Sequence, residues 1–330
     1  MATNIILCVI GFIVLIYAAD KLVEGASNLA MSFGVSKTVV GLTIVAAGTS
    51  LPELVVSINA SIKGNASLSL GNAVGSNIMN IALILGVSAL ICPIVCEKTM
   101  VKRDTPLMIG ATLLVWYLAY TNQTISYNEG IILLVLFFSY FIMTYIVGKK
   151  EAAENPEPAE ATDKPLPSNL KSTVYVIIGF IGLVLGAEAL VRGAVEIAQS
   201  LGVSDEVIGL TLVAIGTSLP ELATSIVAAR KGQSGIAVGN VVGSNIFNIL
   251  AIIGTAATIP MFSDKIAPLA ASEQMLGLHI PIMTVTALAL LPIMKTGMKI
   301  VRLEGLILLV GYIAYTVMLI QTAGAAAPVG

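Results

Sequence analysis

The chain has 330 residues, of which 57% are hydrophobic and only 11% are charged. Soluble domains carry roughly 25% charged residues, so this composition argues against a soluble protein and for a membrane protein. The formal net charge of −2 excludes little, and three cysteines (Cys8, Cys92 and Cys96) provide no disulfide framework. No basic region precedes the first apolar segment, so we do not expect a cleaved signal peptide.

Runs of about 20 apolar residues, the length that crosses a bilayer as a helix, recur along the chain. They predict an all-α membrane protein with ten spans, at residues 3–20, 36–61, 69–91, 104–121, 128–147, 173–191, 205–229, 236–259, 273–294 and 301–321. Residues 148–172 are rich in Glu, Pro and Lys and predict a flexible linker.

The distribution of lysine and arginine predicts the orientation. With the N-terminus outside, 14 of the 17 basic residues lie on the cytoplasmic side, and the three outside are Lys63, Arg192 and Lys265. This is the bias expected of cytoplasmic loops. We therefore expect both termini outside and the linker in the cytoplasm.

The chain contains an internal repeat. Residues 41–86 align without a gap with residues 209–254, and 28 of the 46 positions are identical. Weaker matches follow in the later helices, where Pro106 corresponds to Pro281. The repeat predicts two five-helix halves, residues 1–147 and 173–330. Because five is odd, the second half enters the membrane inverted, as in many secondary transporters.

The most informative motif is Gly-Thr-Ser-Leu-Pro-Glu, at residues 48–53 and again at 216–221. Pro52 has no N–H and its ring clashes with the carbonyl of Gly48, so the helix must break there and expose carbonyls around residues 46–49. Exposed carbonyls in a membrane require a polar cavity or a bound cation. Glu53 follows the first break directly, and Glu221 follows the second. Charged residues inside membrane-spanning segments are rare and usually mark ion pathways.

A second motif repeats as residues 71–80 and 239–248, with Gly-Asn, Gly-Ser-Asn-Ile and a final Asn in common. Ser76 and Asn80 are four residues apart and therefore share one helix face. Asn72 and Asn240 either belong to the site or only brace the helix entrance. Together the two motifs offer carboxylates, hydroxyls, amides and carbonyls, and neither contains His or Cys. This donor set favours hard cations such as Ca²⁺ and Na⁺.

Both motifs resemble the alpha repeats of the sodium/calcium exchangers, within the calcium/cation antiporter superfamily, and most closely their prokaryotic members. The resemblance implies a Ca²⁺ site formed by Glu53 and Glu221 with the carbonyls of Thr49 and Thr217. It also implies two outer Na⁺ sites and a middle site, completed by the residues Ala46, Ser50, Ser76, Ala214, Ser218, Ser244, Asn80 and Asn248. Ca²⁺ and Na⁺ would be transported substrates, and no cofactor is implied. The family further implies that the first and sixth helices slide to alternate access.

Some family members carry aspartate where this chain has Asn80 or Asn248. Two amides favour Na⁺/Ca²⁺ exchange over a K⁺-dependent reaction. Ca²⁺/H⁺ antiport through the same glutamates stays open, and a passive cation channel is a more distant alternative. No Ser/His pair, His-Glu-x-x-His motif or phosphate-binding loop indicates an enzyme. We expect a prokaryotic plasma-membrane protein without nucleic acid or an obligatory protein partner.

Two further acidic residues match between the halves, Asp20 and Glu188, and both lie near the predicted helix ends. They either reach the membrane interface as solvated charges or take part in gating. Glu129 and Glu304 also match and begin helices, where a negative charge in the first turn is favourable.

Overall fold

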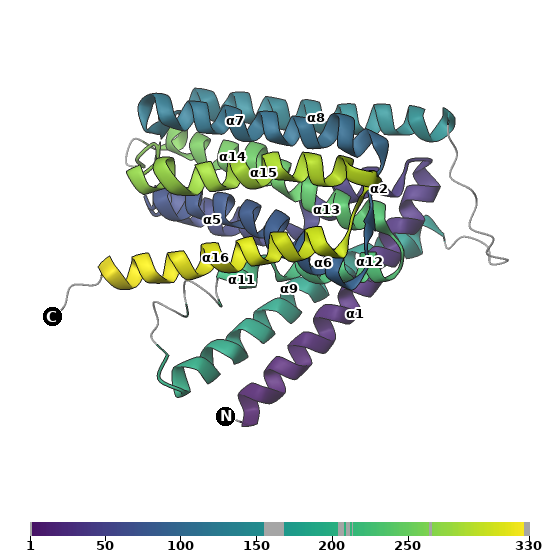
Figure 1. Cartoon of the computed structure of the whole chain (residues 1–330), viewed down its shortest axis with the longest axis horizontal. Coiled ribbons are helices and arrows are strands. Elements are labelled where there is room, and N and C mark those ends of the chain that lie inside the picture. The colour runs from purple at the N-terminus through teal and green to yellow at the C-terminus, as the bar shows by residue number, and fades with distance from the viewer. Residues whose placement is uncertain are drawn as a thin grey trace.

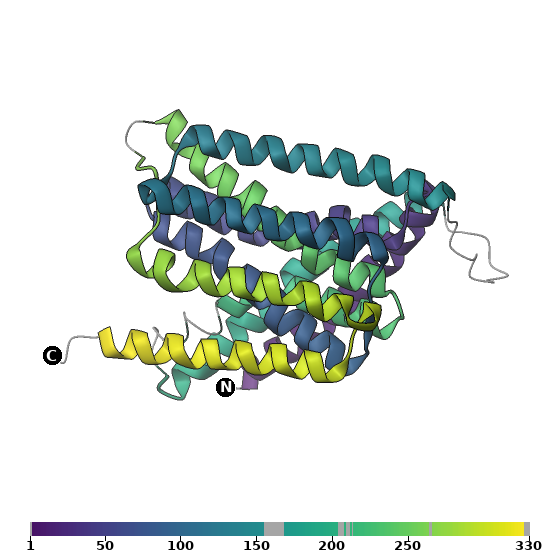
Figure 2. The same ribbon diagram turned by 45° about the horizontal axis from the view of Figure 1, so that its top comes forward.

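The computed structural model describes residues 2–154, 168–203, 208, 212, 214–263 and 266–326. Most helices run side by side along the long axis of the molecule, while α1 and α9 are inclined to the others (Figures 1 and 2). Within these residues, seven helices are long and apolar enough to cross a membrane, and one bent helix pair raises the number to eight. The expected all-helical architecture is therefore confirmed.

The first half of the chain forms the helices of the N-terminal repeat copy. Their bounds are α1 Ala2–Phe33, α2 Lys37–Val40, η1 Gly41–Val45, α3 Ala46–Thr49, α4 Leu51–Ile62, α5 Ala66–Met79, η2 Asn80–Leu85, α6 Gly86–Ile91, η3 Met100–Asp104, α7 Thr105–Asn122 and α8 Tyr127–Glu154.

The second half forms the helices of the other copy. Their bounds are α9 Asn169–Ser200, α11 Ala214–Thr217, α12 Leu219–Arg230, α13 Ser234–Ile246, η5 Phe247–Ile252, α14 Ile253–Thr258, η6 Ile259–Phe262, η7 Met275–His279, α15 Ile280–Lys295, η8 Thr296–Met298 and α16 Arg302–Ala326. Part of the predicted span 205–229 lies outside the described residues.

Several helices are longer than the apolar pattern predicts. The first predicted span ends at residue 20, whereas α1 continues to Phe33, because Lys21 Nζ lies 2.8 Å from Glu24 Oε2 one turn away and pairs the charges along the helix. The predicted linker is helical at both ends, since α8 continues to Glu154 and α9 begins at Asn169. Ser168 caps α9 by accepting a hydrogen bond from the Lys171 N–H.

Two antiparallel strand pairs join loops from the two halves of the chain. β1 (Ile94–Val95) pairs with β4 (Lys299–Ile300), and β2 (Thr124–Ile125) pairs with β3 (Leu269–Ala270). β1 precedes and β2 follows the helix α7, so the two pairs lie at opposite ends of the bundle. The faces are named here by these strands, and the β1/β4 face lies on the right of Figure 1.

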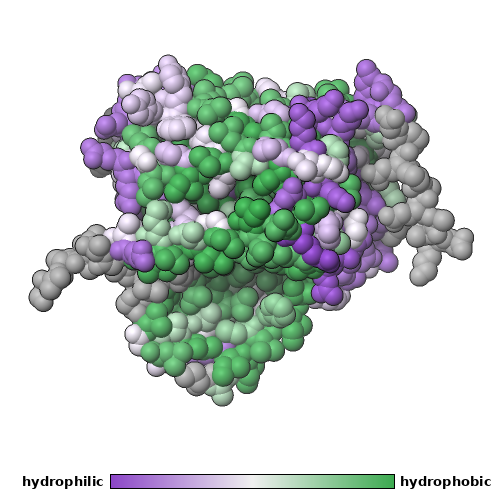
Figure 3. Space-filling view, in the orientation of Figure 1, coloured by the Kyte–Doolittle hydropathy of each residue, from purple (hydrophilic) through white to green (hydrophobic). Residues whose placement is uncertain are grey.

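The surface is apolar between these two ends. Hydrophobic side chains form a broad band across the molecule, and hydrophilic residues gather at its two ends (Figure 3). The exposed hydrophobic side chains of the long helices include Phe138 in α8, Ile181 in α9 and Ile307 in α16. An exposed apolar band between polar ends is the surface expected of a protein surrounded by lipid.

Glycines bring the two halves into close contact inside the bundle. A Cβ atom added to Gly305 of α16 would lie 2.7 Å from the carbonyl oxygen of Gly86, and one added to Gly130 of α8 would lie 2.8 Å from that of Gly254. Small residues at helix interfaces allow such approach in membranes.

This packing makes a prediction about α16. Gly305→Ala should destabilise the protein by about 1–3 kcal/mol, because its methyl group would overlap backbone atoms of α6. Gly311→Ala on the same helix is the matched control, since a Cβ there has no neighbour within 4 Å. Unfolding temperatures of the two variants in detergent measure the difference, and equal temperatures would contradict the packing argument.

Candidate cation-binding site

The two proline-glutamate motifs form matching kinks. α3 ends at Thr49 and α4 begins at Leu51, with a 45° bend between them. Ser50 at the first kink has φ −86° and ψ 6°, and Ser218 at the second has φ −94° and ψ 7°. The first kink is tighter than the predicted break, because the Ser50 N–H still donates to the Ala46 carbonyl at 3.1 Å. Thr49 Oγ1 lies 3.3 Å from the same carbonyl oxygen, which therefore already has two hydrogen-bond partners in the protein.

Each kink serine holds the glutamate of the other motif. Ser50 Oγ donates to Glu221 Oε1 at 3.0 Å, and Ser218 Oγ donates to Glu53 Oε1 at 2.9 Å. Both carboxylates are buried, with only 1% of each residue exposed. The fold thus joins residues from opposite halves of the sequence into one site.

Five further oxygens of the predicted site lack hydrogen-bond partners. These buried, unpartnered atoms are Glu53 Oε2, Glu221 Oε2, Asn80 Oδ1, Asn248 Oδ1 and Ser244 Oγ. An unpaired buried polar atom is costly, and a buried unpaired carboxylate more so. A bound cation would remove this penalty for several of these atoms at once.

An asparagine network fixes the direction of the two amides. Asn80 Nδ2 donates to Asn245 Oδ1 at 3.2 Å, and Asn248 Nδ2 donates to Asn77 Oδ1 at 3.1 Å. The amide groups of Asn80 and Asn248 therefore use their nitrogens on the protein and keep their oxygens free. Asn77 and Asn245 were not among the predicted site residues, although their matched places in the repeat are a usable signal.

Asn72 and Asn240 brace the kinked helices. Asn72 Nδ2 donates to the carbonyl of Glu53 at 3.0 Å and to Ser57 Oγ at 2.9 Å. Asn240 Nδ2 makes the same two bonds, to the carbonyl of Glu221 at 3.3 Å and to Ser225 Oγ at 3.0 Å. These bonds brace the helix behind each glutamate, and Asn240 Oδ1 also accepts a hydrogen bond from Thr49 Oγ1 of the first kink at 3.0 Å, so Asn240 contacts the predicted site as well.

The other predicted site residues lie around the same point. Ser76 Oγ is 3.5 Å from Ser218 Oγ, and Thr49 Oγ1 is 3.0 Å from Asn240 Oδ1. Ala46 is fully buried in α3, and Ala214 begins α11, with its side chain outside the described set.

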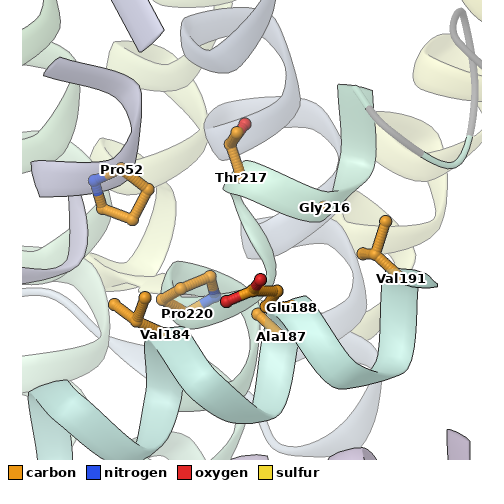
Figure 4. A pocket seen from close by; sticks show the side chains of 8 residues that line it. All are labelled: Pro52, Val184, Ala187, Glu188, Val191, Gly216, Thr217 and Pro220. Atoms are coloured by element: carbon orange, nitrogen blue, oxygen red, sulfur yellow. The ribbon is translucent and has the colours of Figure 1, made fainter. Parts of the chain in front are cut away.

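Thr217 lines a cavity of about 210 Å³ beside the second kink, together with Pro52, Gly216 and Pro220. Glu188 of α9 also borders this cavity and points toward Pro220 (Figure 4). Val184, Ala187 and Val191 of α9 form an apolar wall of this cavity.

The donor set at the kinks is suited to hard cations. No group of three or more His, Cys, Asp or Glu side chains occurs within the described residues, so the two carboxylates are supported by neutral oxygens. Ca²⁺ takes six to eight oxygen ligands of these kinds, whereas soft metals favour sulfur or nitrogen. Cys96 lies apart, in a loop at the β1/β4 face, where burial raises the pKa of its thiol to about 12.

Comparison with known proteins gives a consistent result. The sodium/calcium exchanger protein family model matches residues 3–146 and 171–321. The chain is 39% identical over 327 residues to a protein of Alkalimonas amylolytica named as antiporter CaxA, with 98% of this chain and 100% of that protein covered. It is 34% identical over 353 residues to the sodium/calcium exchanger MaX1 of Methanosarcina acetivorans, with 97% and 99% covered.

A solved structure of the sodium-calcium exchanger NCX_Mj is similar as well. Its TM-score is 0.81 at 35% sequence identity, and the match covers 96% of this chain and 98% of that chain. Sequence and fold both match over nearly the whole chain, and both indicate the same family. The chain belongs to the sodium/calcium exchanger family of cation antiporters.

Proposed function

We propose that the protein exchanges Ca²⁺ against Na⁺ by alternating access to a site between the two kinks. The observation that carries this proposal is the set of buried oxygens without partners: Glu53 Oε2, Glu221 Oε2, Asn80 Oδ1 and Asn248 Oδ1. Two carboxylates held side by side in a dry interior need a cation to offset their charge. The serines that bind the first oxygen of each carboxylate leave the second one for that cation.

The proposed ligands follow from this arrangement and from the family. Ca²⁺ would bind Glu53, Glu221 and the carbonyls of Thr49 and Thr217. Na⁺ would bind in two outer sites formed by Ala46, Ser50, Ser76, Ala214, Ser218 and Ser244, while Asn80 and Asn248 line the middle. Asn77 and Asn245 are added here as the residues that orient the two middle amides.

Charge balance suggests how the two ions compete. Two carboxylates neutralise one Ca²⁺ or two Na⁺. The net charge of the site would therefore be the same with either set of ions bound. If a third Na⁺ moves in each cycle, one net charge crosses the membrane, which changes the free energy by about 2.3 kcal/mol per 100 mV.

We also propose ten spans in two inverted halves, residues 1–147 and 173–330, with both termini outside and residues 148–172 in the cytoplasm. The matched kinks support this plan, and so do the strand pairs. The alignment that matches Pro106 with Pro281 also matches β1 with β3 and β2 with β4. Exchanging the two halves therefore converts the β1–β4 pair into the β3–β2 pair, as a two-fold axis in the membrane plane would. The β1/β4 face is then cytoplasmic.

For the location we propose the plasma membrane of a prokaryote. The apolar band between polar ends and the family of multi-pass exchangers support a membrane position. The absence of a large domain between α8 and α9, which are separated by residues 155–168, is typical of the shorter family members.

The glutamates provide the first test. Glu53→Gln and Glu221→Gln should each reduce Ca²⁺ flux into proteoliposomes by two orders of magnitude or more, because loss of one partner from a buried charged site is worth about 3–5 kcal/mol. Glu129→Gln and Glu304→Gln are matched controls. Their carboxylates accept hydrogen bonds from the N–H groups of Ser126 and Val301 near helix starts, far along the chain from the kinks. Undiminished flux in both kink variants would refute the site.

The coupling ion needs a separate experiment. With pH clamped on both sides, an outward Na⁺ gradient should drive Ca²⁺ uptake into proteoliposomes. Uptake driven only by a pH gradient would instead assign Ca²⁺/H⁺ antiport through the same glutamates. Ca²⁺ flux independent of any counter-ion would indicate a channel.

A further inference from the structure

An ion pair joins the two halves of the protein at the β1/β4 face. Lys231 Nζ, just beyond α12, lies 2.5 Å from Asp20 Oδ1 of α1 and 3.4 Å from the Asp20 carbonyl oxygen. The two side chains are 37% and 38% exposed, so the pair is partly shielded from solvent. The pair holds α1 against the end of the second kinked helix.

Both partners have counterparts of the same charge in the other half. In the gapless alignment of the two repeats, Asp20 corresponds to Glu188 of α9, and Lys231 corresponds to Lys63 at the end of α4. The lysines occupy the same backbone position, since Lys63 has φ −79° and ψ 2°, and Lys231 has φ −81° and ψ 3°. A glycine with positive φ follows each of them.

The counterpart pair is not formed. Among the described residues, neither Glu188 nor Lys63 has an ion-pair partner, and Glu188 borders the cavity beside the second kink instead (Figure 4). The ion pair Asp20–Lys231 is thus formed, whereas its counterpart Glu188–Lys63 is not.

The side chains that pack on the two kinks also differ between the halves. A Cβ added to Gly48 at the first kink would lie within 2.0 Å of the Phe180 ring of α9, so this kink is covered by an aromatic side chain. The counterpart of Phe180 is Phe12 of α1, which is 55% exposed. It does not cover Gly216, whose nearest neighbour is Val191, at the edge of the cavity.

α1 and α9 are packed as one unit between the kinks. A Cβ added to Gly186 would lie 2.7 Å from the Leu15 nitrogen, and one added to Gly179 would lie 2.7 Å from the Leu22 Cβ. A unit joined by such close contacts moves as a rigid body more easily than it deforms. Moving it from one kink to the other would exchange the surroundings of Asp20 and Glu188.

We propose that Asp20–Lys231 and Glu188–Lys63 are two alternating latches for this movement. The first is closed in the present conformation and seals the β1/β4 face, and the second closes at the β2/β3 face when α1 and α9 shift. This proposal rests on the alternating access proposed above, and it adds the residues that position the moving helices. A partly exposed ion pair is weak enough to bias the two states without trapping either one.

The test follows the opening of the cavity beside α9. Val184, which lines the cavity and is 41% exposed, is replaced by cysteine in a full-length chain whose three native cysteines are alanine. The rate of labelling by a membrane-impermeant maleimide then reports how often the cavity is open. The assay needs no ion gradient, so it tests the latch even if the transported ions differ from those proposed, and Ca²⁺ flux is recorded separately.

Loss of the closed latch should reduce this labelling. Asp20→Asn and Lys231→Gln should each slow it about two- to fivefold, the range that one exposed ion pair supplies. Lys63→Gln should not slow it, and combined with Asp20→Asn it should restore the parent rate, because both latches are then lost. The charge swap Asp20→Lys with Lys231→Asp should also restore the rate, which shows that the variants fold.

Two results would overturn the proposal. One is an unchanged labelling rate in both Asp20→Asn and Lys231→Gln. The other is equal slowing by Lys63→Gln, which would mean that these lysines only stabilise the fold. Glu188→Gln is left out of the comparison because Glu188 lies one turn from Val184 and would change the local reactivity of the new cysteine.

Discussion

Two carboxylates, Glu53 and Glu221, are buried next to each other, and each is held by a serine of the opposite motif. Burial of both charges away from water is unfavourable unless other groups are arranged around them. Much of the central architecture provides that arrangement. The prolines set the kinks, and the asparagines behind each glutamate fix the backbone. A second asparagine pair binds the amide nitrogens of Asn80 and Asn248 and leaves their oxygens without a protein partner. Because every element has a counterpart in the other half, the site is completed only when the two halves meet.

The second constraint is close helix packing, which holds this polar centre in an apolar bundle. Gly86 faces Gly305 and Gly130 faces Gly254, so backbones touch where larger residues would separate the helices. Around them, helices turn from α to π geometry at η2 and η5, beginning at Asn80 and Phe247. A π-helical turn shifts the direction of the side chains that follow and is frequent at functional sites. Here it lies at the asparagines whose oxygens have no protein partner.

The sequence alone predicts the helical class, the repeated motifs and the residues that the kinks bring together, because Pro-Glu in an apolar run has few stable surroundings. It fails where individual pairs of groups decide, both within one helix and between the two halves of the chain. The length of α1 depends on the Lys21–Glu24 pair, and the tight form of the first kink depends on the Ser50 N–H, which keeps its bond to Ala46. The crossed serine–glutamate bonds and the orienting roles of Asn77 and Asn245 join residues from opposite halves of the chain. No local pattern encodes such contacts, although the repeat points to them.

Outside the centre the two halves differ, and the differences are informative. At the start of α7 Tyr140 donates to Asp104, whereas at the matched start of α15 Tyr315 bonds to His279. The ends of the helices thus carry different charges, while the kinks carry the same residues. A site with two identical halves cannot by itself favour access from one side. The asymmetry must come from elements that contact the halves unequally, and α1 and α9 do so. Phe180 covers Gly48, whereas Val191 and not Phe12 contacts Gly216, and Asp20 is paired with Lys231 while their counterparts are apart. In the proposed mechanism, the symmetric centre would therefore determine which ions bind, and the inclined pair of helices would determine from which side they reach it.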